Sequence, residues 1–286
     1  MSSIIPRDLI KHLEWIPGNQ PPTPRLPPLP PGGTGSSNQG QGIVQLGAEF
    51  ANYIQVGVNG IHGNPVVISP FEVDGYNNMN YDDTHTKLLE SGLPIYMPTP
   101  RIFTSHFKNV ISAKAGDRKL LYANGSEVED DLVDEMYKHV TRNHKDVYNS
   151  NNAGAWTWLN GRFIKGEGFN GLNIETIIGI KIAKKNKSFE VISTPLEECL
   201  WEDTWTDISL NSQGLAAADS KSATQSNVHG KTMYFWYPRK DHVARFIANS
   251  GRADLSCDRN PTGSNSGLGV FACAEGTASQ KSGGNP

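Results

Sequence analysis

The alternation of apolar and polar residues predicts a strand-rich body that begins near Ile43. Between residues 51 and 58, apolar residues alternate in part with polar ones, as they do in a half-buried strand. Residues 65–73 follow as a second, interrupted strand. Later apolar or alternating stretches, bounded by glycine or asparagine, predict strands at residues 174–182, 188–192 and 232–237.

The clearest helical pattern covers residues 126–149. Its apolar residues recur at helical spacing, and its early aspartates favour the positive end of a helix. Ser126 and Glu129 have the spacing of a capping box, which predicts that the helix begins there. A shorter helix is predicted over residues 5–17, where Pro17 ends it.

Two further stretches predict irregular structure. The pair Asn160-Gly161, set between apolar residues, predicts the turn of a hairpin that leads into residues 162–164. Residues 207–230 nearly lack large apolar side chains, so they are predicted to form a long excursion over the surface.

The first 42 residues differ in composition from the rest. Residues 21–31 are mostly proline, which fixes φ and favours an extended polyproline arm, and residues 32–42 have the composition of a flexible linker. A spacer or an arm that packs on a neighbouring subunit is favoured over a ligand for an SH3-type domain. The predicted parts are an arm and linker at 1–42, a ligand-binding body at 43–276 and a flexible tail at 277–286.

Composition narrows the class of protein. Charged residues make up only 19% and the net charge is −3, so the chain carries no electrostatic footprint for nucleic acid. Three cysteines are too few for a disulfide framework and favour a reducing cytosol, or a particle assembled there. One bridge, between Cys257 and Cys273, stays open as an alternative.

The apolar runs also bear on localisation. None approaches the roughly 20 residues that a membrane span needs, so no membrane insertion is expected. The first residues lack the apolar centre of a signal peptide. The expected locations are therefore the cytoplasm before assembly and a virion, such as a phage tail.

Several candidate catalytic or metal sites are weak. Asp82, Asp83 and His85 are compatible with a metal, but a solvated loop is favoured. Acidic residues flank Cys199 with no nucleophile identified nearby. Trp201 and Trp205 are four residues apart, with core packing favoured over a sugar platform. No catalytic residue, metal site or cofactor is therefore predicted.

The C-terminal part of the body combines two patterns. Alternate residues of a strand face opposite sides, so one set is predicted to enter the core and the other to face solvent. The core set is Ala253, Leu255 and Cys257, and the solvent set is Arg252, Asp254, Ser256 and Asp258. Residues 260–267 are then predicted to form a polar loop, and residues 268–271 a final strand.

Two segments resemble a known family. Asp258-Arg259-Asn260-Pro261 and Leu268-Gly269-Val270-Phe271 resemble the end of the C-type lectin fold in its formylglycine-generating-enzyme-like branch. Residues 66–74, Val-Val-Ile-Ser-Pro-Phe-Glu-Val-Asp, resemble the first strand of that family. The two matches lie at opposite ends of the body, as a fold whose termini meet requires. The resemblance implies an α+β, C-type-lectin-like fold, here with an extended proline-rich N-terminal arm.

Within that branch, the chain is most similar to the variable proteins of diversity-generating retroelements, which include phage tropism determinants. The resemblance implies a non-enzymatic protein that recognises a protein or glycan ligand on a target cell surface and can form homo-oligomers. In this interpretation Trp236 and Tyr237 supply rigid aromatic contacts. An ordinary polar edge strand and loop is the alternative. The full candidate ligand-binding set is Trp236, Tyr237, Phe246, Asn249, Arg252, Asp254, Ser256, Asp258, Asn260, Thr262 and Asn265.

The chain also departs from that branch. Its enzymes use a close cysteine pair near the C-terminus, whereas Cys257 and Cys273 are sixteen positions apart. The calcium-binding motifs of animal lectins are missing, so calcium-dependent sugar binding is not implied. An oxidase-related enzyme and a structural virion or assembly protein are the alternative functions.

Overall fold

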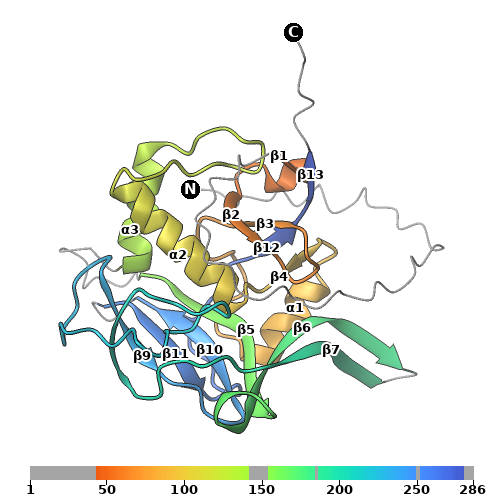
Figure 1. Ribbon diagram of the computed structural model, residues 1–286. Coiled ribbons are helices and arrows are strands. Elements are labelled where there is room, and N and C mark those ends of the chain that lie inside the picture. The colour runs from red at the N-terminus through yellow and green to blue at the C-terminus, as the bar shows by residue number, and fades with distance from the viewer. Residues whose placement is uncertain (1–42, 142–153, 184–185, 249–251, 280–286) are drawn as a thin grey trace. The chain divides into compact units, whose positions relative to one another are not determined.

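The computed structural model describes residues 43–141, 154–183, 186–248 and 252–279. This part of the chain is α+β, as predicted, with more strand than helix (Figure 1). The predicted arm and linker at 1–42 and the predicted helix at 5–17 lie outside the described residues. The helices are α1 (Tyr81–Leu89), α2 (Pro100–Lys114) and α3 (Asp130–Thr141), with short 3-10 helices η2 (Ala48–Phe50) and η3 (Phe169–Gly171).

The largest sheet has seven strands in the order β7-β6-β5-β10-β11-β9-β8. Neighbouring strands are antiparallel except for β11 and β9, which are parallel. The bounds are β5 (Trp156–Lys165), β6 (Leu172–Ala183), β7 (Asn186–Pro195), β8 (Thr204–Asp207), β9 (Thr232–Trp236), β10 (His242–Ile247) and β11 (Asp254–Arg259).

Two smaller sheets join segments from both ends of the described body. A four-stranded sheet has the order β2-β3-β12-β4, and a two-stranded sheet pairs β1 with β13. The predicted flexible tail is therefore wrong for residues 277–279, since they pair with β1. The bounds are β1 (Ile43–Gln45), β2 (Ile54–Asn59), β3 (Pro65–Ile68), β4 (Ile95–Tyr96), β12 (Cys273–Glu275) and β13 (Thr277–Ser279).

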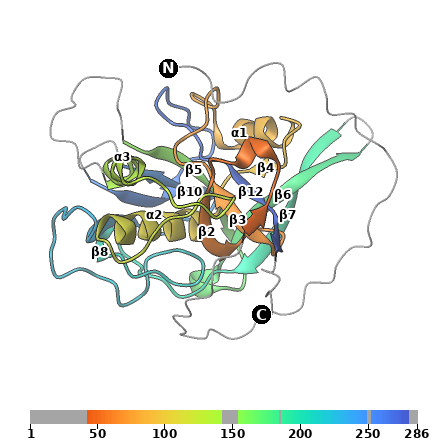
Figure 2. The ribbon, with the colours of Figure 1, turned by 90° about the horizontal axis from the view of Figure 1, so that it is seen from above.

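Helices α2 and α3 cover one face of the seven-stranded sheet (Figures 1 and 2). The rings of Phe103 and Phe107 lie 4.8 and 5.3 Å from that of Phe246 on β10. All three side chains are fully buried. Burying one such ring stabilises the fold by about 1.5–3 kcal/mol, so hydrophobic packing holds α2 on this face.

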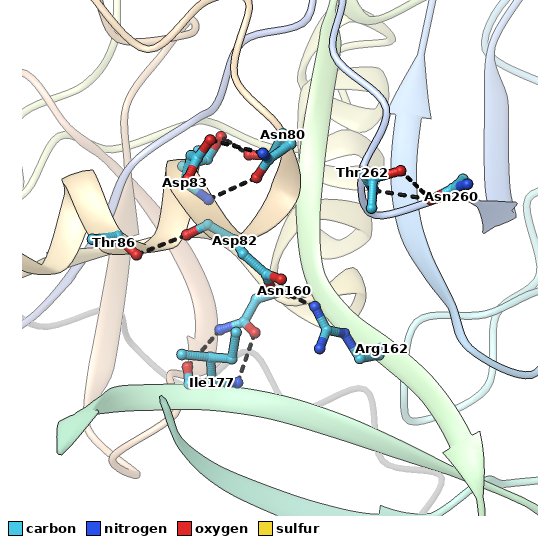
Figure 3. A network of polar contacts seen from close by, with 10 residues as sticks. Asn80, Asp82, Asp83, Thr86, Asn160, Arg162, Ile177, Asn260 and Thr262 are labelled. Carbon is cyan, nitrogen blue, oxygen red and sulfur yellow. Dashed lines mark hydrogen bonds and ion pairs between the residues drawn. The ribbon is translucent and has the colours of Figure 1, made fainter. Parts of the chain in front are cut away.

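Helix α1 covers part of the opposite face. Its Tyr81 packs edge-on against Trp158 of β5 at 5.8 Å, and both are fully buried. The helix is held at its start, where the side chain of Asn80 accepts a hydrogen bond from Asp83 N at 2.8 Å and Asp82 pairs with Arg162 (Figure 3). Among the described residues, no helix covers that sheet face where β10, β11 and β9 form it (Figure 1).

The predicted turn at Asn160-Gly161 is wrong, because β5 runs through it. Asn160 is fully buried, and its side-chain amide both donates to Ile177 O at 2.7 Å and accepts from Ile177 N at 2.8 Å (Figure 3). The regular β5–β6 ladder begins only at Arg162. The amide therefore satisfies two backbone groups of β6 where the ladder is absent.

The other predicted elements are confirmed, shortened or, in one case, wrong. Helix α3 begins at Asp130, four residues after Ser126, whose hydroxyl donates to Asn124 Oδ1 instead of capping the helix. The part of that predicted helix beyond Thr141 is outside the described residues. The excursion between β8 and β9 is confirmed, as it carries only isolated bridges. The predicted final strand at residues 268–271 is wrong and forms only an isolated bridge.

In the described residues, none of the helices combines the length and apolar character needed to cross a bilayer.

Candidate functional site

One sheet face carries aromatic and polar side chains where the other carries the core. Pairing between strands sets Asp254 opposite Tyr234, and Ser256 opposite both Trp236 and Arg245. A β-bulge between β10 and β11 then sets Arg259 opposite Val243. We call this surface the outer face. Its residues are Trp156, Trp205, Tyr234, Trp236, Arg245, Arg252, Asp254, Ser256 and Arg259.

Aromatic rings and guanidinium groups pack on each other across the outer face. The guanidinium of Arg252 lies 4.6 Å from the ring of Tyr234 and 5.7 Å from that of Trp205. Tyr234 in turn contacts Trp205 at 5.4 Å and Trp236 at 5.1 Å. Each cation–π contact contributes about 0.5–1 kcal/mol at an exposed site, so these side chains hold one another in place.

The predicted exposure of Asp254 and Ser256 is wrong, since they are only 5% and 1% exposed. Long side chains from neighbouring strands cover them, and Arg252 Nε lies 2.7 Å from Asp254 Oδ1. Burial raises the pKa of Asp254 above its usual value, and the charge of Arg252 opposes this only in part. The predicted core set of Ala253, Leu255 and Cys257 is confirmed.

A second cluster lies at the margin of the outer face, where β9 ends. Arg239 pairs with Asp203 at 2.8 Å and with Asp258 at 3.7 Å. The ring of Tyr237 lies 5.2 Å from the Arg239 guanidinium and 4.9 Å from the ring of Trp201. Trp201 is 38% exposed, so its predicted place in the core is wrong. Trp205, also predicted in the core, lies on the outer face instead.

The polar loop at residues 260–267 adjoins the outer face and is held by its own side chains. Asn260 Oδ1 accepts hydrogen bonds from the backbone N and the hydroxyl of Thr262, both at 2.9 Å (Figure 3). Asn265 Oδ1 accepts from Gly267 N at 3.1 Å. Tyr81 N donates to the carbonyl of Pro261 at 3.1 Å, which ties the loop to the start of α1. Asn260, Thr262 and Asn265 are exposed, as predicted.

The predicted ligand-binding set is brought together in part. Trp236, Arg252, Asp254 and Ser256 share the outer face, with Tyr237 and Asp258 at its margin. Phe246 is fully buried beneath α2, so its assignment to the binding surface is wrong. Asn249 lies outside the described residues.

Sequence reasoning missed Trp156, Arg245 and Arg259. The signal for Arg245 was present, because it alternates with the buried Ala244 and Phe246 of β10. Arg259 had no such signal, since the bulge in β11 interrupts the alternation on which the prediction rested.

All three cysteines are free and buried, so the alternative Cys257–Cys273 bridge is not formed. Burial, aided by the charge of Glu198, raises the pKa of the Cys199 thiol to about 12. Burial also holds the pKa of Cys257 and of Cys273 well above the usual range. These thiols stay protonated at neutral pH and are poor nucleophiles.

A partly buried ion pair supports the start of β5. His139 Nε2 lies 2.6 Å from Glu72 Oε2, and Trp156 N donates to Glu72 Oε1 at 2.8 Å. Burial would raise the pKa of Glu72, but the charge and the hydrogen bond of His139 outweigh it and hold that pKa below its usual value. The pair therefore links α3 to the strand that carries Trp156.

The acidic group at α1 has structural roles. Asp82 pairs with Arg162, and Asp83 takes part in the cap formed by Asn80. His85 is fully buried, and burial lowers its pKa to about 3. No group of three or more metal-ligating side chains gathers within the described residues. The predicted solvated loop is therefore wrong, because all three residues lie in α1 and the His85 side chain is in the core.

Two surface hollows lie away from the outer face. One, of about 490 Å³, lies along α1 beside Tyr76 and Lys87. The other, of about 610 Å³, lies between the end of α2 and the start of α3. Neither includes a residue of the outer face.

Comparisons of the chain with models of known families, with curated proteins and with solved structures found no match. Fold and site define an α+β protein with a seven-stranded mixed sheet. One face of that sheet is closed by helices, and the other presents packed aromatic, arginine and aspartate side chains.

Proposed function

We propose that this protein is a non-enzymatic recognition protein that binds a ligand on a target cell surface. Its binding surface is the outer face together with loop 260–267. The observation that carries the proposal is the cluster of Trp205, Tyr234 and Arg252 on the same outer face whose Arg259 and Trp156 border the loop with the exposed Asn260 and Asn265. Tyrosine, tryptophan and arginine dominate binding energy at interfaces, and small amide and hydroxyl side chains supply adaptable hydrogen bonds.

Rigidity of the outer face supports this proposal. Ordering one long side chain on binding costs about 0.5–1.5 kcal/mol. Arg252 is already held by Asp254 and by two rings, and Arg239 is held by two carboxylates. A ligand that meets these side chains therefore loses less affinity to ordering than it would on a surface of free arginines.

We further propose a C-type-lectin-like fold of the kind found in the variable proteins of diversity-generating retroelements. Two findings support it. β12, near the end of the described body, pairs with β3 near its beginning, which is the meeting of termini that this fold requires. Core residues of β11 alternate with residues of the outer face, which separates a fixed scaffold from a polar surface. The protein would act on a phage tail or a cell surface.

The genomic test of that class is specific. A retroelement of this kind keeps a near-copy of the variable coding segment close by. We expect an adjacent near-copy of the codons for residues 243–273, adenine-rich at the codons that differ. If the differing codons instead fall mainly on the core residues Leu255 and Cys257, the assignment to this class is wrong.

The binding function is tested with the labelled full-length protein on a panel of intact cells, scored by flow cytometry. We expect the variant Trp236→Ser, Asp258→Ala, Asn265→Ala to lose at least tenfold in binding to the cells that the parent stains. A matched control changes three exposed residues elsewhere: Lys108→Ala, Glu135→Ala and Val191→Ser. Equal binding by parent and outer-face variant, with both folded by circular dichroism, would contradict the proposal.

The thiols separate a binder from the alternative thiol-dependent enzyme. Their burial and raised pKa values support the binder, because a reactive thiol needs access and thiolate character. We expect a variant with Cys199, Cys257 and Cys273 changed to alanine to keep its cell binding, with some loss of thermal stability. Loss of all binding by this variant while it stays folded would favour the enzyme.

A further inference from the structure

Two arginines at the outer face lack the ion pairs that the others have. Arg239 and Arg252 each contact aspartate, and these pairs use Asp203, Asp254 and Asp258. Arg245 and Arg259 form no ion pair within the described residues. Four guanidinium groups thus face three carboxylates, and the unmatched positive charge falls on β10 and the end of β11.

The two unpaired guanidinium groups lie close to each other and partly out of solvent. The bulge that sets Arg259 opposite Val243 brings it to the same side of the sheet as Arg245. The Nε atoms of both are shielded from solvent, with no hydrogen-bond partner among the described residues. Burial, followed by repulsion from Arg259, lowers the pKa of Arg245 to about 10, although Asp258 and Asp254 act in the opposite direction.

An aromatic ring and a polar loop lie beside these two arginines. The Arg245 guanidinium lies 5.9 Å from the ring of Trp156, whose buried indole nitrogen has no hydrogen-bond partner in the described part of the chain. Arg259 lies against Gly263, where an added Cβ would come within 3.1 Å of Nη2. Gly267 packs in the same way on the Trp156 ring. Loop 260–267 therefore borders Arg259 and the Trp156 ring that Arg245 contacts.

We propose that Arg245 and Arg259 form a subsite for a carboxylate of an acidic protein ligand, an inference that rests on the recognition function proposed above. Arginine matches the planar, two-oxygen geometry of a carboxylate, and a ligand carboxylate offsets the unmatched charge. A protein ligand is favoured because the arginines lie on a sheet face that continues into the exposed polar loop 260–267, and an interface with a protein needs no deep pocket.

The test is fluorescence anisotropy with a labelled peptide of alternating glutamate and glycine, added to the full-length protein. We expect Arg245→Gln, Arg259→Gln to weaken peptide binding at least tenfold, which is about 1.4 kcal/mol. The matched control, Lys108→Gln with Lys165→Gln, removes the same charge from exposed residues of α2 and β5 and should change binding less than twofold. Arg245→Lys, Arg259→Lys should fall between parent and glutamine variant, because lysine keeps the charge without the fork.

Three results would overturn the inference. One is an equal loss of peptide binding in Arg245→Gln, Arg259→Gln and in the control Lys108→Gln, Lys165→Gln, which would indicate a nonspecific charge effect. Another is no loss in the folded arginine variant. The third is that the peptide does not bind, whereas an oligoglucuronate of equal charge binds in a way that depends on the two arginines. That result would make the ligand an acidic glycan. If the double variant does not fold, Arg259→Gln is compared with Lys165→Gln, and at least a threefold loss is expected.

The peptide-binding test and the cell-binding test can give negative results independently of each other. Peptide binding that depends on Arg245 and Arg259 needs neither Trp236 nor Asn265, so it can persist when cell binding is absent. Conversely, cell binding through Trp236 and Asn265 can persist when the peptide does not bind, and then only the carboxylate subsite is wrong.

Discussion

Arg252, two residues before the first residue of β11, places its Nε 2.7 Å from Asp254 Oδ1 and its guanidinium over the ring of Tyr234 at 4.6 Å. Asp254 is 5% exposed. Burial raises its pKa despite the nearby positive charge, so the folded protein holds the ionised form less well than the unfolded chain does. The ion pair therefore orders side chains of the outer face, but it does not fully offset the free-energy cost of burying the Asp254 carboxylate.

This relationship predicts unequal effects of removing each partner. We expect Asp254→Asn to change the free energy of unfolding little at pH 7, because it removes a buried charge that burial disfavours. Arg252→Ala should destabilise by about 3 kcal/mol, because it leaves that carboxylate buried and unpaired. Urea unfolding of both variants measures the difference. Equal losses, or a larger loss for Asp254→Asn, would contradict this account.

A second expectation concerns Asn160, whose amide serves Ile177 N and O inside the sheet. Asn160→Leu keeps the approximate volume but leaves two buried backbone groups of β6 without partners. An unsatisfied buried group costs about 1–3 kcal/mol, so we expect a loss of about 2–6 kcal/mol in urea unfolding. Lys165→Ala, at the exposed end of the same strand, is the control and should stay within about 0.5 kcal/mol.

The local pattern of apolar residues was sufficient to predict strands whose own residues carry that pattern. β2 and β9 follow the predicted strands closely, because β2 alternates in part and β9 is a run of apolar and aromatic residues. Helix α2 was missed, although Thr99 at its cap, Pro100 at its start and its apolar spacing were all readable. Its signal needed only a search for a proline-initiated helix.

Features that depend on distant partners could not be predicted in this way. Asp254 is buried because Arg252, Tyr234 and Trp205 meet above it, and Trp205 and Tyr234 come from other strands. The amide of Asn160 is typical of a turn in sequence, but its bonds to Ile177 place it inside a sheet. Polar residues in β11 and β5 are therefore covered by side chains that a local pattern does not identify.

The Glu72–His139 pair sets an acid limit to stability. Its contacts hold the Glu72 pKa below the usual value, so the folded state favours the ionised carboxylate. The resulting stabilisation is present above the unfolded pKa of about 4.3 and is lost as pH falls through the lower folded pKa. We expect Glu72→Gln to lower the melting temperature at pH 7 and to reduce its fall below pH 4.3. An unchanged acid profile in Glu72→Gln would show that the pair does not contribute.

His106 gives the opposite kind of test, in which a substitution stabilises. It is fully buried in α2, neither ring nitrogen has a hydrogen-bond partner among the described residues, and burial, together with the charge of His139, lowers its pKa to about 4. In the unfolded chain the His106 ring is protonated as pH falls through about 6.5, whereas in the folded protein it is protonated only near pH 4. The stabilising contribution of the neutral ring is thus complete above pH 6.5 and is lost as pH falls toward 4.

His106→Met replaces the ring with an adaptable apolar side chain beside Phe103 and Phe271. We expect the variant to match or exceed the parent in free energy of unfolding at pH 7, because no hydrogen bond to the described residues is lost. Its advantage should grow between pH 6.5 and 4, where only the parent is penalised by protonation of the unfolded chain. Urea unfolding at pH 7, 5.5 and 4.5 measures this. The control is His62→Gln, since His62 is exposed. A constant difference between His106→Met and parent across the three pH values would show that His106 titrates alike in the folded and unfolded states.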